Sequence, residues 1–189
     1  MSQIYYYLKQ CLLYLFLIAY ILLLAKVLLF KEVSPSELFN ADRAISRIFS
    51  LTPFETIFGY FSSTHFNLWI ALMNVVGNIV LFIPLGIYLQ IFKKNKKILN
   101  CVALACAISL GVEVTQYILG IGRTDIDDII LNTLGGMLGV FVYKIIYLLL
   151  KNENKARTAV TFLFCLVCVC SGACYFILVA LTGLKIKIL

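Results

Sequence analysis

The sequence contains little charge and few of the residues on which common catalytic motifs depend. Charged residues make up 13% of its 189 residues, whereas 62% are hydrophobic. Such a chain is too apolar for a water-soluble domain, and its length allows about five membrane crossings of roughly 20 residues each. It has one histidine, His65, and no HExxH motif, nucleophile elbow or Cys/His pair. The sequence therefore predicts an integral membrane protein without the usual hydrolase signatures, in which His65 is an interfacial residue.

Neither the basic residues nor the cysteines indicate a soluble partner or a cofactor. The net charge is +7, but Lys and Arg are scattered between apolar runs and form no long basic face, which argues against nucleic-acid binding. The seven cysteines lie in apolar segments, and their uneven number argues against a full disulfide framework. Helical spacing sends the four cysteines of the last run to both sides of the helix, so they cannot converge on one metal ion. These four are Cys165, Cys168, Cys170 and Cys174. We expect packing roles for them and no cofactor.

Long apolar runs define the predicted membrane spans. The first, at residues 11–30, is long for a signal peptide and lacks a small-residue cleavage site, so we expect an uncleaved anchor. The second runs from Trp69 to about Phe92 and the third from about Ile98 to Leu119. The fourth follows an acidic segment at residues 125–128, and the last covers about residues 158–184. The predicted fold is an all-α bundle of about five transmembrane helices.

The orientation follows from one basic loop, KKNKK at residues 93–97, which the positive-inside rule places in the cytoplasm. By alternation the N-terminus is cytoplasmic, whereas residues 31–68, residues 120–125 and the C-terminus are extracytoplasmic. Within residues 31–68, two capping boxes at 34–37 and 52–55 each carry proline at the first helical position. We expect one or two short interfacial helices there; the alternative is a small folded loop over the bundle.

Polar residues concentrate between residues 109 and 139. Polar groups cost several kcal/mol each in hydrocarbon unless they are paired or hydrated, so this cluster is a functional-site candidate. On a helix, Asp125, Asp128 and Asn132 share one face with the glycines at 135, 136 and 139. Arg123 beside them is a natural counter-ion.

Asp127 points away from that face. The sequence Thr124-Asp125-Ile126-Asp127 fits a capping box with Thr124 as the N-cap, so we expect a capping role for Asp127.

The second and third spans also carry polar side chains at helical spacing. Asn74 and Asn78 share one face, either as ligands or as interhelical hydrogen-bonding residues, with Gly77 between them to permit close approach. Ser109, Glu113 and Gln116 form one stripe of the third span. By depth, Asn78, Glu113 and Asn132 should reach one level, on the order of 10 Å below the outer surface. We predict a polar pocket open to the extracytoplasmic side, bounded by Asn74, Asn78, Glu113, Gln116, Arg123, Asp125, Asp128 and Asn132.

Taken together, four motifs resemble the VanZ-like family of bacterial membrane proteins. They are TPFETI at residues 52–57, NxxGNxxxFxPxG at 74–86, ExxQ at 113–116 and GRxDxDDxxxNxxG at 122–135. The motifs cover roughly residues 50–143, and the whole chain, 1–189, is expected to form one membrane domain of this family. The resemblance implies a multi-pass plasma-membrane protein whose namesake raises resistance to teicoplanin, a lipid-tailed glycopeptide.

Two functions follow as hypotheses. In the first, the chain is a non-enzymatic accessory factor in glycopeptide resistance or cell-envelope homeostasis, and its pocket binds a polar headgroup, a lipid-linked cell-wall intermediate or a lipoglycopeptide. In the second, it is a membrane enzyme that modifies a lipid-linked cell-wall intermediate. Glu113 or Asp128 would then be the general base, with a divalent ion held by these two and Asp125 as a variant. A transporter is disfavoured because the chain has no internal repeats.

Overall fold

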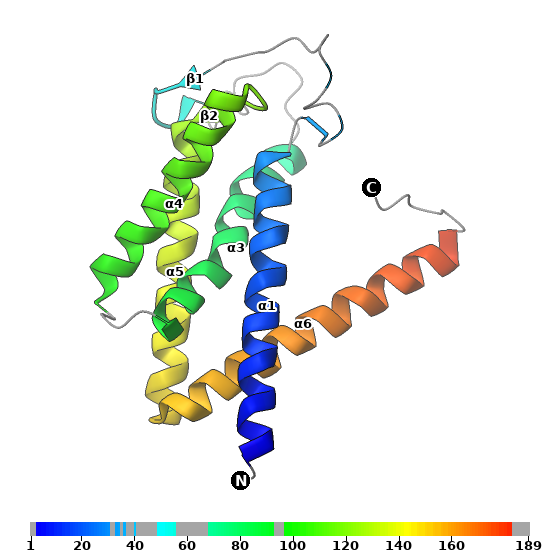
Figure 1. Cartoon of the computed structure of the whole chain (residues 1–189). Helices are drawn as coiled ribbons and strands as arrows, with labels where there is room; N and C mark the ends of the chain where they lie inside the picture. Colours follow the sequence, from blue (N-terminus) through cyan, green and yellow to red (C-terminus); the bar gives the residue numbers. More distant parts are fainter. Residues whose placement is uncertain are drawn as a thin grey trace. The chain divides into compact units, whose positions relative to one another are not determined.

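The computed structural model describes residues 3–30, 33, 34, 36, 40, 49–55, 68–92 and 97–182, and side chains up to residue 169 (Figure 1). Its long helices are α1 (Gln3–Leu29), α3 (Leu68–Phe92), α4 (Ile98–Leu119), α5 (Ile126–Leu150) and α6 (Glu153–Thr182). Two short strands, β1 (Phe49–Ser50) and β2 (Thr124–Asp125), pair in parallel. The predicted all-α class is confirmed, with this two-residue ladder as an addition.

Four described helices are long and apolar enough to cross a membrane. The qualifying segments are Tyr7–Leu29, Ala71–Phe92, Ile98–Leu119 and Ile126–Leu150. They confirm a polytopic membrane protein and the second and third spans at their predicted positions. The last predicted span extends past Thr182, beyond the described residues, so the fifth crossing stays a prediction.

Several other predictions fall outside the described residues. These are the apolar faces of the two interfacial helices, two of the four residues of the first capping box, His65, four residues of the basic loop, and the side chains of Cys170 and Cys174. The five cysteines with described side chains, including Cys165 and Cys168, form no disulfide bond with one another.

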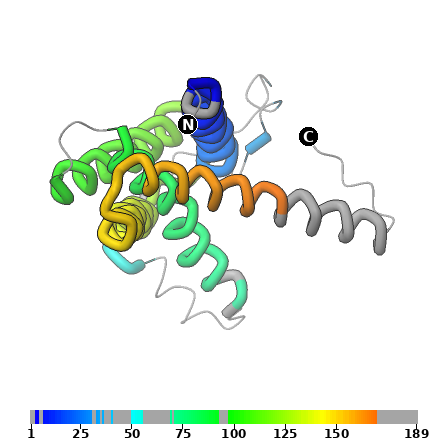
Figure 2. The backbone as a smooth tube through the Cα atoms, turned by 90° about the horizontal axis from the view of Figure 1, so that it is seen from below, coloured from blue at the N-terminus to red at the C-terminus, as the bar shows by residue number. Residues whose placement is uncertain are grey.

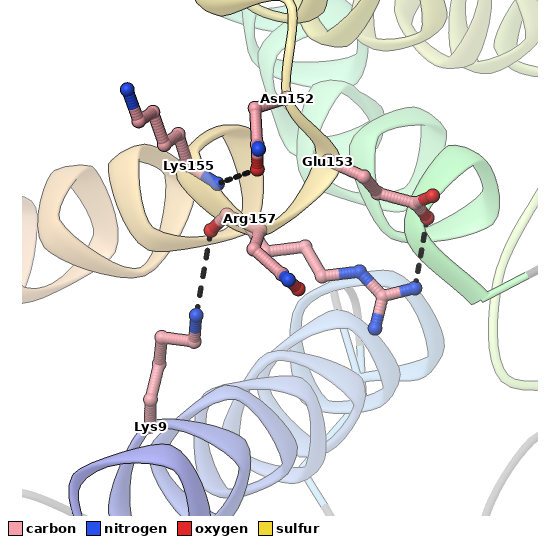
Figure 3. A network of polar contacts seen from close by, with 6 residues as sticks. Lys9, Asn152, Glu153, Lys155 and Arg157 are labelled. Atoms are coloured by element: carbon pink, nitrogen blue, oxygen red, sulfur yellow. Dashed lines mark hydrogen bonds and ion pairs between the residues drawn. The ribbon is translucent and has the colours of Figure 1, made fainter. Parts of the chain in front are cut away.

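The chain forms two compact units, one of residues 1–16 with 146–189 and one of residues 17–145. In the first unit, α6 is one uninterrupted helix (Figure 2). Asn152 caps it by accepting a hydrogen bond from the Lys155 N–H at 3.1 Å, and Arg157 pairs with Glu153 at 3.0 Å (Figure 3). From α1, the Lys9 ammonium donates to the Thr158 hydroxyl at 3.0 Å.

In the second unit, α3 and α5 touch backbone to backbone. A Cβ on Gly135 would overlap the carbonyl oxygen of Ile79, and a Cβ on Gly139 would overlap that of Ile83. Gly86 of α3 meets the carbonyl of Gly136 in the same way. We call this line of glycine contacts the α3–α5 seam. Small residues allow such close packing of membrane helices. The glycines that the sequence places on one face of α5 provide it here.

The connection between α4 and α5 is a tight turn with defined caps. Gly120 ends α4 in the left-handed region at φ 57°, and the Ile121 N–H returns to the Gln116 carbonyl at 3.1 Å, as in a Schellman motif. Helix α5 then begins at Ile126. Its cap is Asp125, whose carboxylate accepts from the Asp127 N–H at 3.0 Å. The predicted capping box is therefore wrong in its register: Thr124 lies in β2, and its hydroxyl donates to the Glu113 carbonyl at 3.2 Å.

The predicted capping box at residues 52–55 is also wrong. Phe54 has φ 65°, which the first turn of an α-helix does not allow. Instead the Glu55 N–H bonds to the Thr52 carbonyl at 3.2 Å, with Pro53 second and a positive φ third, the pattern of a type II turn. The Glu55 carboxylate accepts from the Ser50 hydroxyl at 2.6 Å and so joins this turn to β1.

Candidate functional site

A pocket of about 180 Å³ lies in the unit of residues 17–145, where α1 and α4 end and α5 begins. The β1–β2 pair lies at the same junction of α4 with α5 (Figure 1). Five of the eight predicted site residues line the pocket, from three helices that are distant in sequence. They are Asn74 and Asn78 of α3, Glu113 and Gln116 of α4, and Asp128 of α5.

Asp128 and Asn78 join α5 to α3 at the pocket. Asn78 is 8% exposed, and its amide donates a hydrogen bond to the Asp128 carboxylate at 2.5 Å. The predicted face of α3 therefore meets the predicted face of α5. Because carboxylates are acceptors only, the amide of Asn78 is oriented with its nitrogen toward Asp128.

Glu113 joins the pocket to the turn after α4. Its side chain is 2% exposed, and one carboxylate oxygen accepts from the Asp125 N–H at 2.9 Å. A buried carboxylate needs such donors to remain stable away from water. The same residue lines the pocket, so Glu113 both holds the β2 backbone and borders the cavity.

Gln116 has one satisfied and one unsatisfied polar atom. Its amide nitrogen donates to the Leu28 carbonyl of α1 at 2.9 Å, whereas its amide oxygen is buried without a hydrogen-bond partner. The nitrogen cannot exchange places with the oxygen, because the oxygen would then face another acceptor. Gln116 thus has one buried acceptor without a hydrogen-bond partner among the described residues.

Three predicted site residues do not line the pocket. Asp125 is buried as the cap of α5, and Arg123 is exposed and forms no ion pair within the described part of the chain with Asp125 or Asp128. Asn132 is fully buried one helical turn, about 6 Å, deeper than Asp128, and it bonds the Ser109 hydroxyl at 3.0 Å. Asn132 therefore does not share the level predicted for it with Glu113.

The carboxylates are not arranged to bind a metal ion. Among the described residues, no three His, Cys, Asp or Glu side chains gather closely enough to hold one. The predicted trio of Glu113, Asp125 and Asp128 is divided because the Asp125 side chain is turned to the Asp127 backbone.

Asp127 has a structural role that the sequence did not indicate. It is 2% exposed, and its carboxylate accepts from the Phe54 N–H, 73 residues earlier in the chain. The expected separation of Asp127 from Asp128 is present, and Asp127 secures the turn at residues 52–55, a contact that the predicted capping role did not include.

The pocket also has apolar walls that sequence reasoning missed. Val27 and Leu28 of α1 and Met73 and Leu81 of α3 complete it. Gly77 borders it too, and a Cβ there would meet nothing within 4 Å, so the expected close approach of a helix at Gly77 is wrong. The sequence did contain a signal for this wall of α3. Met73, Gly77 and Leu81 are spaced four residues apart, so they form a stripe of the helix next to that of Asn74 and Asn78.

Comparison with known proteins gives one family and one relative. The model of a family described as VanZ/LLP1 matches residues 16–148, which include the whole pocket. Protein VanZ from Enterococcus faecium is 40% identical over 70 residues, which cover 37% of this chain and 44% of that relative. The match thus spans less than half of the relative's length. No solved structure matches the chain.

Proposed function

The chain belongs to the VanZ/LLP1 family, and from this premise we propose that it is an accessory membrane factor in teicoplanin-type glycopeptide resistance or cell-envelope homeostasis. In this proposal it acts by binding a polar group in the pocket. The observation that supports a binding role is the convergence of Asn74, Asn78, Glu113, Gln116 and Asp128 on one pocket among apolar helices. Polar side chains at this depth are costly in a membrane helix unless they serve a function.

The size of the pocket favours a headgroup as its ligand. Its volume of about 180 Å³ is below the roughly 300–1,000 Å³ of pockets for drug-sized ligands. A lipid headgroup or a single substituent of a drug fits this space, whereas a whole glycopeptide does not. The proposed location is the plasma membrane, with the pocket toward the extracytoplasmic side, where cell-wall intermediates and glycopeptides meet.

The enzyme hypothesis has less support. A general base must reach the proton it removes, and here Glu113 and Asp128 border the pocket as that role requires. Each also receives a structural hydrogen bond, from Asp125 and Asn78 respectively. Lipid analysis of cells with and without the protein separates the two functions, because only the enzyme changes the mass of a cell-wall lipid.

Teicoplanin susceptibility of a sensitive bacterial host expressing the protein tests the proposal. Asp128→Asn keeps the shape of the side chain and removes its charge, so we expect susceptibility to return to that of the host without the protein. The matched control is Glu153→Gln, another carboxylate-to-amide change, at a partly exposed pair in the other unit. Full resistance with Asp128→Asn, at equal abundance in the membrane, would refute a role for the pocket.

A further inference from the structure

A groove lies between α1 and α6, within the unit of residues 1–16 and 146–189. Its volume is about 160 Å³, and it shares no lining residue with the pocket at Asp128. Four of its lining side chains are apolar, those of Leu8, Leu12, Phe162 and Cys165, and two are threonines. Lys9 is the one charged residue among the described residues that line it. We call this cavity the Lys9 groove.

Two neutral acceptors hold the Lys9 side chain. Its ammonium donates to the Thr158 hydroxyl at 3.0 Å and to the Asn154 carbonyl at 3.4 Å, both in the first two turns of α6 (Figure 3). The Thr158 hydroxyl in turn donates to the Asn154 carbonyl at 2.8 Å. Within the part of the chain that the structure describes, Lys9 forms no ion pair. Its positive charge is therefore oriented but not neutralised by these contacts.

The charge around the Lys9 groove is also positive. In the sequence of this unit, Glu153 is the one acidic residue, against six basic residues. Three of the basic residues, Lys151, Lys155 and Arg157, lie at the start of α6, and Arg157 pairs with Glu153 at 3.0 Å. An anion that approaches Lys9 is therefore attracted by an excess of positive charge, whereas a cation is repelled.

Lys9 lies near one end of a membrane-crossing segment. It is the third residue of the apolar segment Tyr7–Leu29, so its Cα is about 3 Å inside the end of that segment. The flexible stem of a lysine can place its ammonium at the membrane interface. Lys9 is thus at the level of lipid headgroups.

The apolar side chains of the groove lie on the bilayer side of Lys9. Phe16 of α1 contacts Phe164 of α6 with ring centroids 6.5 Å apart, and Lys9 contacts Thr158. Residues 9 to 16 therefore run in the same direction as residues 158 to 164. Both helices thus continue from Lys9 toward the interior of the apolar segment, and their groove residues 12, 162 and 165 follow in that direction.

We propose that the Lys9 groove binds an anionic phospholipid of the bilayer, with the lipid phosphate at the Lys9 ammonium and an acyl chain along Leu12, Phe162 and Cys165. Basic pockets between membrane helices recognise anionic headgroups through such charge complementarity. The apolar walls favour a lipid over a soluble phosphate, because they bury methylenes that a soluble phosphate lacks. This site goes beyond the proposed function, since it lies in the other unit and does not depend on the pocket at Asp128.

Lipid retention by the full chain tests the inference. The protein is reconstituted into nanodiscs of phosphatidylcholine and phosphatidylglycerol in equal amounts, and the lipids that stay bound after release are counted by native mass spectrometry. We expect phosphatidylglycerol to be retained about fivefold more than phosphatidylcholine, the effect of one basic residue near anionic lipid. Equal retention of the two lipids by the wild-type protein would overturn the inference without reference to any variant.

Substitutions of lysine locate the site. Lys9→Gln should remove the preference for phosphatidylglycerol, whereas Lys9→Arg keeps the charge and should retain it. The matched control is Lys97→Gln, which removes an exposed positive charge before α4 in the other unit and should leave the preference unchanged. An equal loss in Lys9→Gln and Lys97→Gln would show that the lipid follows the overall charge of the protein, which contradicts a site at Lys9.

Cys165→Phe tests the apolar part of the groove while Lys9 stays in place. The larger side chain fills the space proposed for the acyl chain, so retention of phosphatidylglycerol should fall. Retention at the wild-type level in Cys165→Phe would place the lipid outside the Lys9 groove and would refute the proposal.

Discussion

Asp127 and Asp128 are adjacent acidic residues with different partners. Asp127 is buried, and its carboxylate accepts a hydrogen bond from the Phe54 N–H. The Asp128 carboxylate accepts a hydrogen bond from the Asn78 amide and lines the pocket. Successive residues on a helix point about 100° apart, so one can secure the preceding loop while the other lines the pocket. Substitutions at these two positions should therefore affect different properties.

Asp127→Ala should lower the free energy of unfolding by about 1 kcal/mol, because it leaves the part-buried Phe54 N–H without this acceptor. Asp127→Asn keeps an acceptor oxygen and should cost less than Asp127→Ala. Denaturant unfolding of the detergent-solubilised protein measures both. Teicoplanin resistance should persist in Asp127→Asn. Equal loss of resistance in Asp127→Asn and Asp128→Asn, at normal abundance, would show that the two side chains do not have separate roles.

Among the helices, the α3–α5 seam fixes the relation of Asn78 to Asp128. Gly135 and Gly139 contact the carbonyls of Ile79 and Ile83 on α3, about two and three turns of α5 after Asp128. Backbone contact sets the spacing of the two helices independently of side-chain rotamers. The two polar side chains therefore meet at a fixed separation.

Gly139→Ala should destabilise the unit by about 1–3 kcal/mol, as expected for overpacking, because the new methyl group would overlap the Ile83 carbonyl. Gly111→Ala is the matched control. A Cβ at Gly111 meets nothing within 4 Å, so this change should be neutral or stabilising, since Ala is the better helix former by about 1 kcal/mol. Thermal unfolding in detergent compares them. Equal stability of the two variants would contradict the backbone contact.

Hydropathy predicted α3 and α4 closely, because a membrane helix is determined by local composition. The sequence also brought Asn74, Asn78, Glu113, Gln116 and Asp128 together correctly from their helical spacing. It could not predict the connections between the helices. The β1–β2 pair and the contact that holds the left-handed Phe54 join residues that are distant in sequence.

The predicted depth of Asn132 was wrong for a similar reason. The rise per residue gives depth along one helix, but it does not give the offset of that helix relative to its neighbours. The pairing of Asn132 with Ser109, one turn before Glu113, shows that α5 is displaced along α4 relative to that expectation. Such an offset is determined by packing at Gly136 against Ala105, which no periodicity reveals.

For the molecule as a whole, the membrane orientation remains a prediction, based on the basic loop at residues 93–97. It places the turn between α4 and α5 outside and the turn between α5 and α6 inside. Arg123 and Lys155 are exposed residues in or next to these two turns. They are therefore suitable positions for testing the orientation.

An impermeant thiol reagent should label Arg123→Cys in intact cells and Lys155→Cys only after the cells are permeabilised. The native cysteines are first replaced, because Cys11 and Cys168 are exposed. Labelling of Lys155→Cys in intact cells, with protection of Arg123→Cys, would reverse the orientation and place the pocket near the cytoplasmic side.

The glycine contacts of the α3–α5 seam also restrict how a lipid could reach the pocket. Where two backbones touch, no acyl chain fits between the helices, so this side is closed to the bilayer. A lipid whose headgroup occupies the pocket must leave its tails on another side of the unit. For such a lipid, the route of lateral access would lie away from α3 and α5 at Gly135 and Gly139, and bulky residues introduced along the remaining helix faces should obstruct it.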